Sequence, residues 1–463
     1  MEFSNLFYVL AAVLFILGLK KLSHPKTART GNTIAAIGML IAIVTTLIAY
    51  GGIDYKLIAL GVIIGSLIGG IFATKVEMTG MPQMVALFNG FGGGASALVA
   101  AAEFYTRAAP EVLSGNTENF LLTTIAVSVF VGTLTITGSF IAFAKLQGLI
   151  SGQPIVFKGQ QVLNALFALT LIASGAGMIL STENMMFHFL GVIVLAAILG
   201  ITLTIPIGGA DMPVVISLLN SYSGVAAAAT GFVLMNNGLI ISGSLVGASG
   251  LILTNIMCKG MNRSLANVIF GAVGLQQEGA VSSGKEMNIK SYSTEEAAMI
   301  LDAADKVIVV PGYGLAVAQA QHAIREVSDY LEGLGKSVLY AIHPVAGRMP
   351  GHMNVLLAEA NVPYEQLKDL DEINSEFEDC DVSIILGAND VVNPAARHDT
   401  SSPIYGMPIL DVDKSKTVMV NKRTMNPGFA GIQNELFGFD NTIMVFGDAK
   451  DMLNKLLSDL KDL

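Results

Sequence analysis

Long runs of apolar residues dominate the first 260 positions of the chain, and a different pattern follows them. Each run is close to the ~20 residues that a helix needs to cross the hydrocarbon core of a bilayer. We expect membrane-spanning helices at about 4–19, 32–50, 57–74, 81–102, 120–143, 162–180, 187–206, 212–235 and 238–258. The sequence therefore predicts a polytopic α-helical membrane bundle of about nine spans.

Beyond the bundle, helical patterns alternate with short runs rich in β-branched residues. The alternation is typical of a Rossmann-like, doubly wound parallel sheet. We expect strands at about 306–310, 337–342, 382–386, 407–410, 417–421 and 442–446. Gly, Gln, Ser and Lys replace apolar residues in the stretch between the two patterns, which indicates a linker. The predicted parts are a membrane domain over 1–260, a linker over 261–290 and an α/β domain over 291–463.

Composition supports this division, since only 13% of the residues are charged, against the ~25% usual for soluble proteins. Lys20, Lys21, Lys26 and Arg29 follow the first predicted span, and Lys145 falls on the same side of the membrane when the predicted spans alternate. Short loops rich in Lys and Arg stay on the cytoplasmic side, so we expect the N-terminus outside and, after an odd number of spans, the α/β domain in the cytoplasm. We interpret the first span as retained, because no basic segment precedes it.

Charge and cysteine content exclude some functions. The formal charge of −10 argues against nucleic-acid binding. Cys258 and Cys380 both fall on the inner side, where we expect no disulfide.

Glycines spaced four residues apart mark places where helices can approach closely. One stripe is Gly61, Gly65 and Gly69, and another is the pair Gly243 and Gly247. The simplest interpretation of both is tight helix packing.

Polar residues inside predicted spans are costly in hydrocarbon and normally face a partner or a wet cavity. Asn89 and Asn220 are the clearest, and either helix-to-helix hydrogen bonding or the lining of a proton path explains them. Ser139 is a weaker companion, because hydroxyls often bond to their own helix. Asp211 lies at the inner mouth of the eighth span. Either a role in the proton path or a role as the N-cap of that helix explains it.

A glycine loop follows the first predicted strand of the α/β domain. Gly312 and Gly314 open a helix there, so that backbone amides can face a pyrophosphate. The motif alone is weak, because Val317 stands where a third glycine is usual and a plain turn also uses glycines. Polar loops at 387–390, 421–423 and 447–450 strengthen it, because ligands bind at the carboxyl ends of such strands.

The residues after the second strand bear on which nucleotide binds. An NAD site places Asp or Glu there, whereas this chain has His343 and then Arg348. Lys422 and Arg423 could neutralise a 2′-phosphate, although a solvated basic pair is the simpler alternative. Together with the polar loops, these residues favour NADP(H).

Several long strings resemble the β subunit of proton-translocating NAD(P) transhydrogenases. They lie at 208–215, 219–224, 311–321, 343–354, 387–390 and 447–450, and the resemblance covers essentially the whole chain. It implies a proton-conducting bundle with an NADP(H) domain, and a separate α subunit of one or two chains that carries NAD(H). Hydride would pass directly from NADH to NADP⁺ as protons move inward, with no catalytic side chain and no metal. The resemblance also implies a bacterial inner membrane and a dimer of the heteromeric unit.

The resemblance assigns residues to the NADP(H) site. The site residues lie in loops that follow strands: Gly312, Tyr313, Gly314; Ala346, Gly347, Arg348, Met349, Pro350; Gly387, Ala388, Asn389, Asp390; Lys422, Arg423; Gly428, Phe429; Asp448, Ala449. From the polar positions in and next to the predicted spans, we expect a proton pathway and its coupling to involve Asn89, Ser139, Asp211, Asn220 and Arg263.

Two departures from the family pattern matter. Phe429 stands where many relatives have Tyr in the loop that covers the nucleotide, which removes a hydroxyl donor. Asn89 stands where some relatives have a histidine, and an amide cannot titrate. We therefore expect a histidine on a partner span to face Asn89 and Asn220, and we expect Asp211 and Arg263 to transmit protonation to the nucleotide domain.

Two other classes of function are compatible with parts of the sequence. One is a transporter or sensor that NADP(H) regulates without redox chemistry. The other is a membrane oxidoreductase that reduces a quinone, which would need a flavin or metal centre. Two cysteines and no clustered histidines offer no such centre.

Overall fold

The computed structural model describes residues 2–49, 55–108, 119–181, 184–270, 288–349, 351–402, 404–426 and 432–463. The chain forms two compact units, a helical bundle and an α/β domain, which divide near Thr254. The predicted domain and linker boundaries remain predictions, and most of the predicted linker lies outside the described residues.

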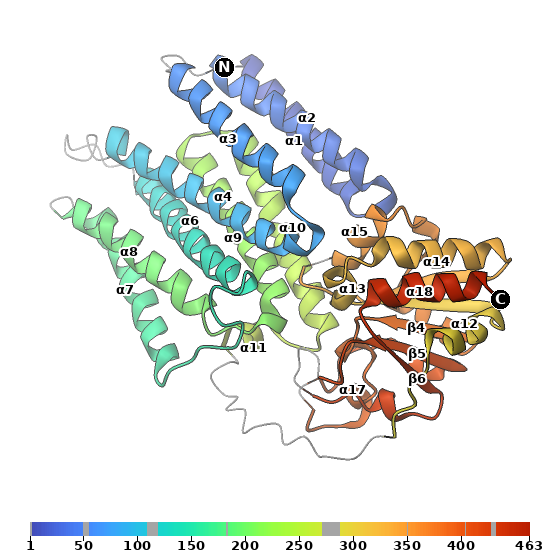
Figure 1. Ribbon diagram of the computed structural model, residues 1–463. Coiled ribbons are helices and arrows are strands. Elements are labelled where there is room, and N and C mark those ends of the chain that lie inside the picture. The colour runs from blue at the N-terminus through green and yellow to red at the C-terminus, as the bar shows by residue number, and fades with distance from the viewer. Residues whose placement is uncertain are drawn as a thin grey trace. The chain divides into compact units, whose positions relative to one another are not determined.

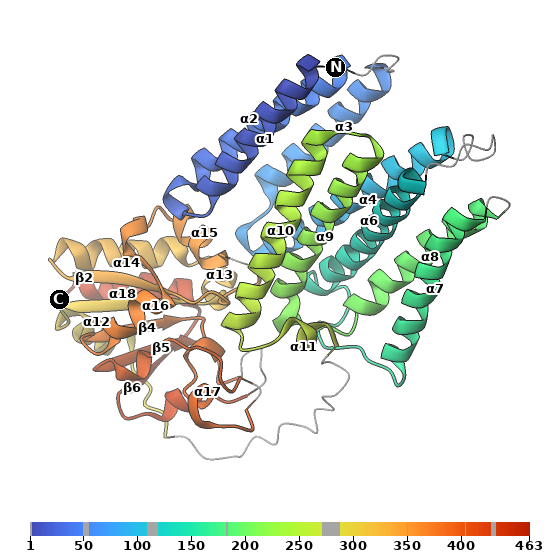
Figure 2. The same cartoon turned by 180° about the vertical axis from the view of Figure 1, so that it is seen from behind.

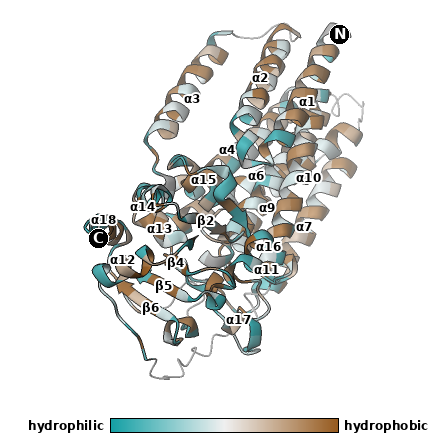
Figure 3. Ribbon diagram, turned by 90° about the vertical axis from the view of Figure 1, so that its right-hand side faces the viewer, coloured by the Kyte–Doolittle hydropathy of each residue, from teal (hydrophilic) through white to brown (hydrophobic). Residues whose placement is uncertain are grey.

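In the described part of the chain, nine helices are long and apolar enough to cross a membrane, as the sequence predicts. They are α1 (Glu2–Leu22), α2 (Pro25–Ala49), α3 (Tyr55–Lys75), α4 (Met81–Glu103), α6 (Asn119–Leu146), α7 (Gln160–Leu180), α8 (Met185–Thr204), α9 (Met212–Val233) and α10 (Asn237–Gly260). Hydrophobic residues run along these helices (Figure 3). The chain is therefore a multi-pass membrane protein.

The centre of the bundle is α9, of whose apolar stretch 67% is buried, against none for α3. It lies beside α4 and α6, which also pack against each other (Figures 1 and 2). Gly243 on α10 faces α9 closely, since a Cβ there would stand 2.7 Å from the carbonyl oxygen of Gly224. Close packing of that stripe is confirmed. Around the stripe of Gly61, Gly65 and Gly69, in contrast, no other helix of the described chain comes within 4 Å of the Cβ positions.

The α/β domain contains one sheet of six parallel strands in the order β3-β2-β1-β4-β5-β6. The strands are β1 (Lys306–Pro311), β2 (Ser337–Ile342), β3 (Leu367–Asp369), β4 (Val382–Leu386), β5 (Thr417–Lys422) and β6 (Thr442–Phe446). This order is the doubly wound arrangement that the alternating pattern predicts.

Helices and turns cover both faces of the sheet (Figure 1). On one face, α12 (Thr294–Asp302), α14 (Gln321–Gly333) and α18 (Ala449–Lys461) pack together. On the other face, α16 (Leu370–Ile373) and the turns η6 (Asn374–Phe377) and η9 (Glu435–Gly438) pack against alternate strand residues such as Ile308 and Val310. Shorter helices are α11 (Leu265–Phe270), α13 (Tyr313–Val317), α15 (His352–Glu359) and α17 (Ala395–His398).

One predicted strand is wrong and one strand was missed. Residues 407–410 form no strand, because Pro408 has no N–H to give to a ladder. The neighbouring groups bond to loops instead, as in the 3.0 Å bond from Leu410 N to Val391 O. The true third strand, β3, has only three residues and no β-branched run to mark it.

A short segment before α12 pairs with the last strand of the sheet, β6. Ser291 bridges to Met444 in parallel, with bonds of 2.9 Å from Tyr292 N to Met444 O and 2.8 Å from Met444 N to Lys290 O. Ser293 then begins α12 with a reciprocal capping box. This segment, residues 288–292, thus covers the free edge of β6.

Candidate functional site

The strand order reverses between β1 and β4, and ligands of open α/β sheets bind at such a switch point, outside the carboxyl ends of the strands. Four loops meet there, following β1, β4, β5 and β6. They are the loops that the sequence singled out.

The glycines at the switch point let two loops touch. A Cβ on Gly314 would stand 2.6 Å from Gly387 Cα, and a Cβ on Gly312 would stand 2.5 Å from Ala388 N. Gly387 itself has a φ of 69°, which disfavours any side chain. These three positions therefore require glycine for backbone contact alone.

Two of the amides in this contact are engaged. Gly312 N donates to Leu386 O at 2.9 Å, and Gly314 N donates to Gly387 O at 3.0 Å. The sequence indicates that backbone amides of this loop can face a pyrophosphate, which stays a prediction. In the structure the amides of Gly312 and Gly314 join the loop after β1 to the loop after β4, and α13 is a helix of only five residues.

A cavity of about 230 Å³ opens between the four loops. Its lining is rich in glycine, amide and basic side chains: Gly314, Ala318, Gly387, Ala388, Asn389, Asn421, Lys422, Arg423, Thr424, Asn426, Gly447 and Ala449. Seven of these twelve positions were predicted from the sequence as site residues. An anion with hydrogen-bonding groups suits such a lining.

The two predicted cations line the cavity from different sides. Lys422 Nζ lies 3.2 Å from Asn389 Oδ1 and 4.7 Å from the ring centroid of Phe437. Burial lowers the pKa of the Lys422 ammonium, while the carboxylate of Asp390 acts in the opposite direction. Arg423 is exposed, with Nε 3.7 Å from a carboxylate oxygen of Asp448. One cation is thus fixed near the β4 loop and the other near the β6 loop.

Two asparagines that hold the loops were not predicted as structural supports. Asn421 is buried, and its Nδ2 donates to Val445 O at 3.0 Å and Gly447 O at 3.3 Å. Asn434 is also buried and donates from Nδ2 to Asn389 O at 2.9 Å. A buried amide at the end of an otherwise apolar strand was the available signal for Asn421.

The loop after β2 packs against the loop after β1. The guanidinium of Arg348 lies 4.3 Å from the ring centroid of Tyr313, as in a cation–π contact. Ala346 and Met349, in the same loop as Arg348, are buried. The structure therefore brings the predicted residues Tyr313 and Arg348 together.

His343 anchors this loop. Its Nε2 donates to Pro408 O at 2.7 Å, and its Nδ1 accepts from Val345 N at 3.2 Å, so both ring nitrogens are used by the neutral form. Burial lowers the pKa of His343 to about 4.

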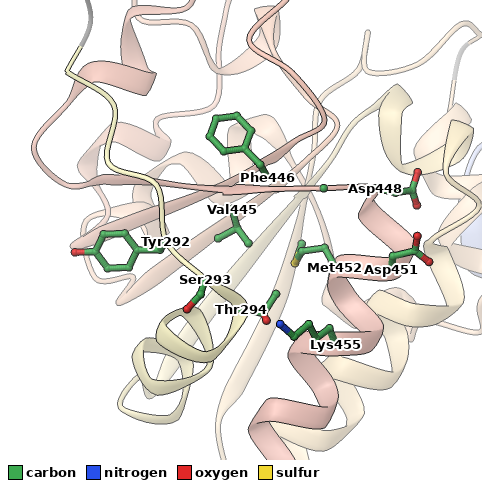
Figure 4. Close-up of a pocket in the computed structure, with 10 residues that line it drawn as sticks. Tyr292, Ser293, Thr294, Val445, Phe446, Asp448, Asp451, Met452 and Lys455 are labelled. Carbon is green, nitrogen blue, oxygen red and sulfur yellow. The ribbon is translucent and has the colours of Figure 1, made fainter.

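A second cavity, of about 330 Å³, lies at the β6 edge. Tyr292 and Thr294 line one side of it and α18 lines another, where Asp448 and Asp451 lie close together (Figure 4). Gly447 lines both cavities. Of the residues that line the second cavity, the sequence analysis singled out Gly447 and Asp448, in the loop at 447–450.

Within the bundle, the predicted polar residues gather where α4, α6 and α9 meet. Asn89 is buried and donates from Nδ2 to Ile216 O at 3.2 Å, which joins α4 to α9. Ser139 is buried against Gly90, whose Cβ would stand 3.0 Å from the serine Cβ. Asn220 lies one turn beyond Ile216, on the same side of α9.

The last two predicted coupling residues are Asp211 and Arg263. Asp211 occupies the N-cap position of α9, but its side chain makes no capping hydrogen bond. Arg263 follows α10, where its amide donates to Cys258 O at 2.9 Å. The two residues belong to different compact units.

Comparison with known proteins decides the family. The family model of the NAD(P) transhydrogenase beta subunit matches residues 4–459. A protein of Rhodospirillum rubrum named NAD(P) transhydrogenase subunit beta is 52% identical over 453 residues, which cover 97% of each chain. A second sequence, from a named strain of the same species, has the same name, identity and coverage. The chain belongs to the NAD(P) transhydrogenase beta subunit family.

Membership of the transhydrogenase family agrees with a membrane bundle joined to a parallel α/β sheet, and it implies an α-subunit partner. The structure places most of the predicted site residues around the switch point. Pro350, Gly428 and Phe429 lie outside the described residues. The assignment of all these residues to an NADP(H) site stays a prediction.

Proposed function

We propose that this chain binds NADP(H) and conducts protons as part of a proton-translocating transhydrogenase, with NAD(H) on its α subunit. The observation that carries the proposal is the cavity with Lys422 and Arg423 at the switch point of the sheet, in a chain of this family. A 2′-phosphate distinguishes NADP(H) from NAD(H), and two cations suit it.

The residues present fit such a nucleotide. Arg423 is exposed and close to Asp448, so its guanidinium can turn from the carboxylate to a phosphate. Lys422 is held by Asn389 and contributes a fixed point charge. The contact among Gly312, Gly314 and Gly387 fixes the loops that would bracket the dinucleotide.

Bound NADP(H) would supply hydride chemistry, and the role of this chain would be to orient the nucleotide and exclude water. Direct transfer from NADH needs no acid, base or metal from the protein. The predicted nicotinamide loop is 387–390, and Asn434 supports it by bonding to Asn389 O.

We further propose that protons pass where α4, α6 and α9 meet. Asn89 and Ser139 are buried there, and neither titrates near neutral pH. The titrating group would be a histidine on an α-subunit span. Asp211 and Arg263 would couple its protonation to the nucleotide domain, with the N-terminus outside and that domain in the cytoplasm of a bacterium.

The test is reduction of an NADP⁺ analogue by NADH in sealed vesicles that contain the chain with its α subunit, with a pH-sensitive dye present. Hydride transfer with an uncoupler-sensitive proton signal supports the proposal. A K422M/R423Q variant should lose affinity for NADP(H), while R397Q, a matched change of an arginine that pairs with Asp411 and Asp413, should keep it. Tight NADP(H) binding with neither signal would show a sensor or transporter instead.

A further inference from the structure

Lys145, in the last turn of α6, holds its ammonium group inside the bundle. Only 5% of the residue is exposed, although a lysine at the end of a span normally reaches into water. The sequence indicates only that this lysine marks the cytoplasmic side.

Three backbone carbonyls surround the ammonium. Lys145 Nζ donates to Gln153 O at 3.1 Å, to Ile205 O at 2.6 Å and to Ile207 O at 2.9 Å. An ammonium group has three hydrogens, so each has its own acceptor. Ile205 and Ile207 follow the end of α8, where helix carbonyls lack partners and the helix dipole favours a cation.

These bonds join three elements at one end of the bundle. Gln153 belongs to the loop between α6 and α7, and the two isoleucines belong to the α8–α9 turn, residues 205–211. The same loop and turn are also joined directly, by the 2.9 Å bond from Gly209 N to Gly152 O. Lys145 therefore fixes the turn to the end of α6.

The α8–α9 turn leads straight into the functional helix. Asp211 is its last residue, and α9 begins at Met212. One turn further on, Ile216 O accepts the bond from Asn89. A shift of the turn would thus move both Asp211 and the contact between α4 and α9.

We infer that Lys145 is a positioning residue for proton translocation, because its ammonium sets where α9 starts relative to α6. This inference rests on the proposed function. The lysine touches neither nucleotide, so its loss should alter coupling while NADP(H) affinity stays unchanged.

The experiment uses the complete complex in sealed vesicles and measures protons moved per hydride transferred, together with NADP(H) affinity. With Lys145→Met we expect the proton-to-hydride ratio to fall about tenfold, within the range typical of coupling between sites. A merely structural defect would lower the amount of active complex and leave the ratio intact. A wild-type ratio in Lys145→Met would overturn the inference.

Two matched controls distinguish the loss of the Lys145 contacts from the loss of any lysine or any buried side chain at this end of the bundle. Lys158→Met removes an exposed lysine of the same loop and should keep the wild-type ratio. Gln160→Met removes a fully buried side chain whose Nε2 donates to Thr202 O at 3.0 Å, at the same end of the bundle. An equal loss of ratio in Gln160→Met would also overturn the inference.

If Lys145→Met does not accumulate, Lys145→Arg decides. Arginine keeps the positive charge. Its N–H donors lie in one plane, however, so they cannot point at the three carbonyl oxygens as the three hydrogens of an ammonium group do. A lowered ratio with normal NADP(H) affinity supports the inference, and a wild-type ratio overturns it. If the wild-type complex itself moves no protons, the proposed function fails, which is a distinguishable result.

Discussion

Replacing His343 with glutamine should remove most of the acid sensitivity of the loop after β2. In the folded protein the neutral imidazole is buried, and its pKa falls from 6.5 to about 4. Between these two pH values the unfolded chain binds a proton that the folded one does not, so stability is full above pH 6.5 and declines as the pH falls toward 4.

The size of this effect follows from the two pKa values. The folded state loses about 2 kcal/mol at pH 5 and about 3 kcal/mol at pH 4, relative to neutral pH. Glutamine can donate to Pro408 O and accept from Val345 N as the imidazole does, but it cannot gain a proton. His343→Gln should therefore cost about 1 kcal/mol at pH 7.5 through imperfect geometry and then change little on acidification.

Hydrogen–deuterium exchange of peptides that cover residues 337–349 measures this in the full chain. Wild type and variant are compared at the same pH, so that the intrinsic exchange rate cancels. The exposed His322 provides the control substitution, His322→Gln, which should behave as wild type. Equal losses of protection in wild type and His343→Gln between pH 7 and 4.5 would show that His343 is not the acid-sensitive group.

Three more outcomes are expected. Lys422→Met should weaken NADP(H) binding about tenfold, as loss of one charge-assisted contact implies, with NADH affinity of the complex unchanged; equilibrium dialysis would measure it. Gly314→Ala should force the loop at Gly387 to move, cost about 1–3 kcal/mol of stability and lower NADP(H) affinity, which thermal unfolding and titration would detect. Tyr292→Pro removes the donor to Met444 O and should speed amide exchange along β6; unchanged exchange would show that residues 288–292 contribute little.

The sequence was sufficient for the architecture because apolar runs and β-branched runs are local signals. All nine helices of the described bundle and five of the six strands lie where the pattern predicts. The strand predicted at 407–410 is wrong, because that prediction rested on apolar content, and Pro408 cannot donate a ladder hydrogen bond. The short β3 carries no such signal and could not be found this way.

The site was only partly predictable, because the type of a residue does not tell which way its side chain points. Lys422 and Arg423 are adjacent in sequence, yet one contacts the β4 loop and the other approaches Asp448. The glycines at 312 and 314 indicated a phosphate loop, while the structure uses their amides between loops. Lys145 was interpreted only as a topology signal, since burial of its ammonium depends on carbonyls more than 50 residues away.

The pairing of residues 288–292 with β6 has a practical consequence for studying the α/β domain alone. A fragment that begins at residue 291, the predicted domain boundary, lacks Lys290, whose carbonyl accepts from Met444 N. The outer edge of β6 would then present unpaired backbone groups to other molecules, and such edges promote association between chains. A fragment that begins at or before Ile289 keeps this edge covered, and should remain monomeric at concentrations where the shorter one aggregates.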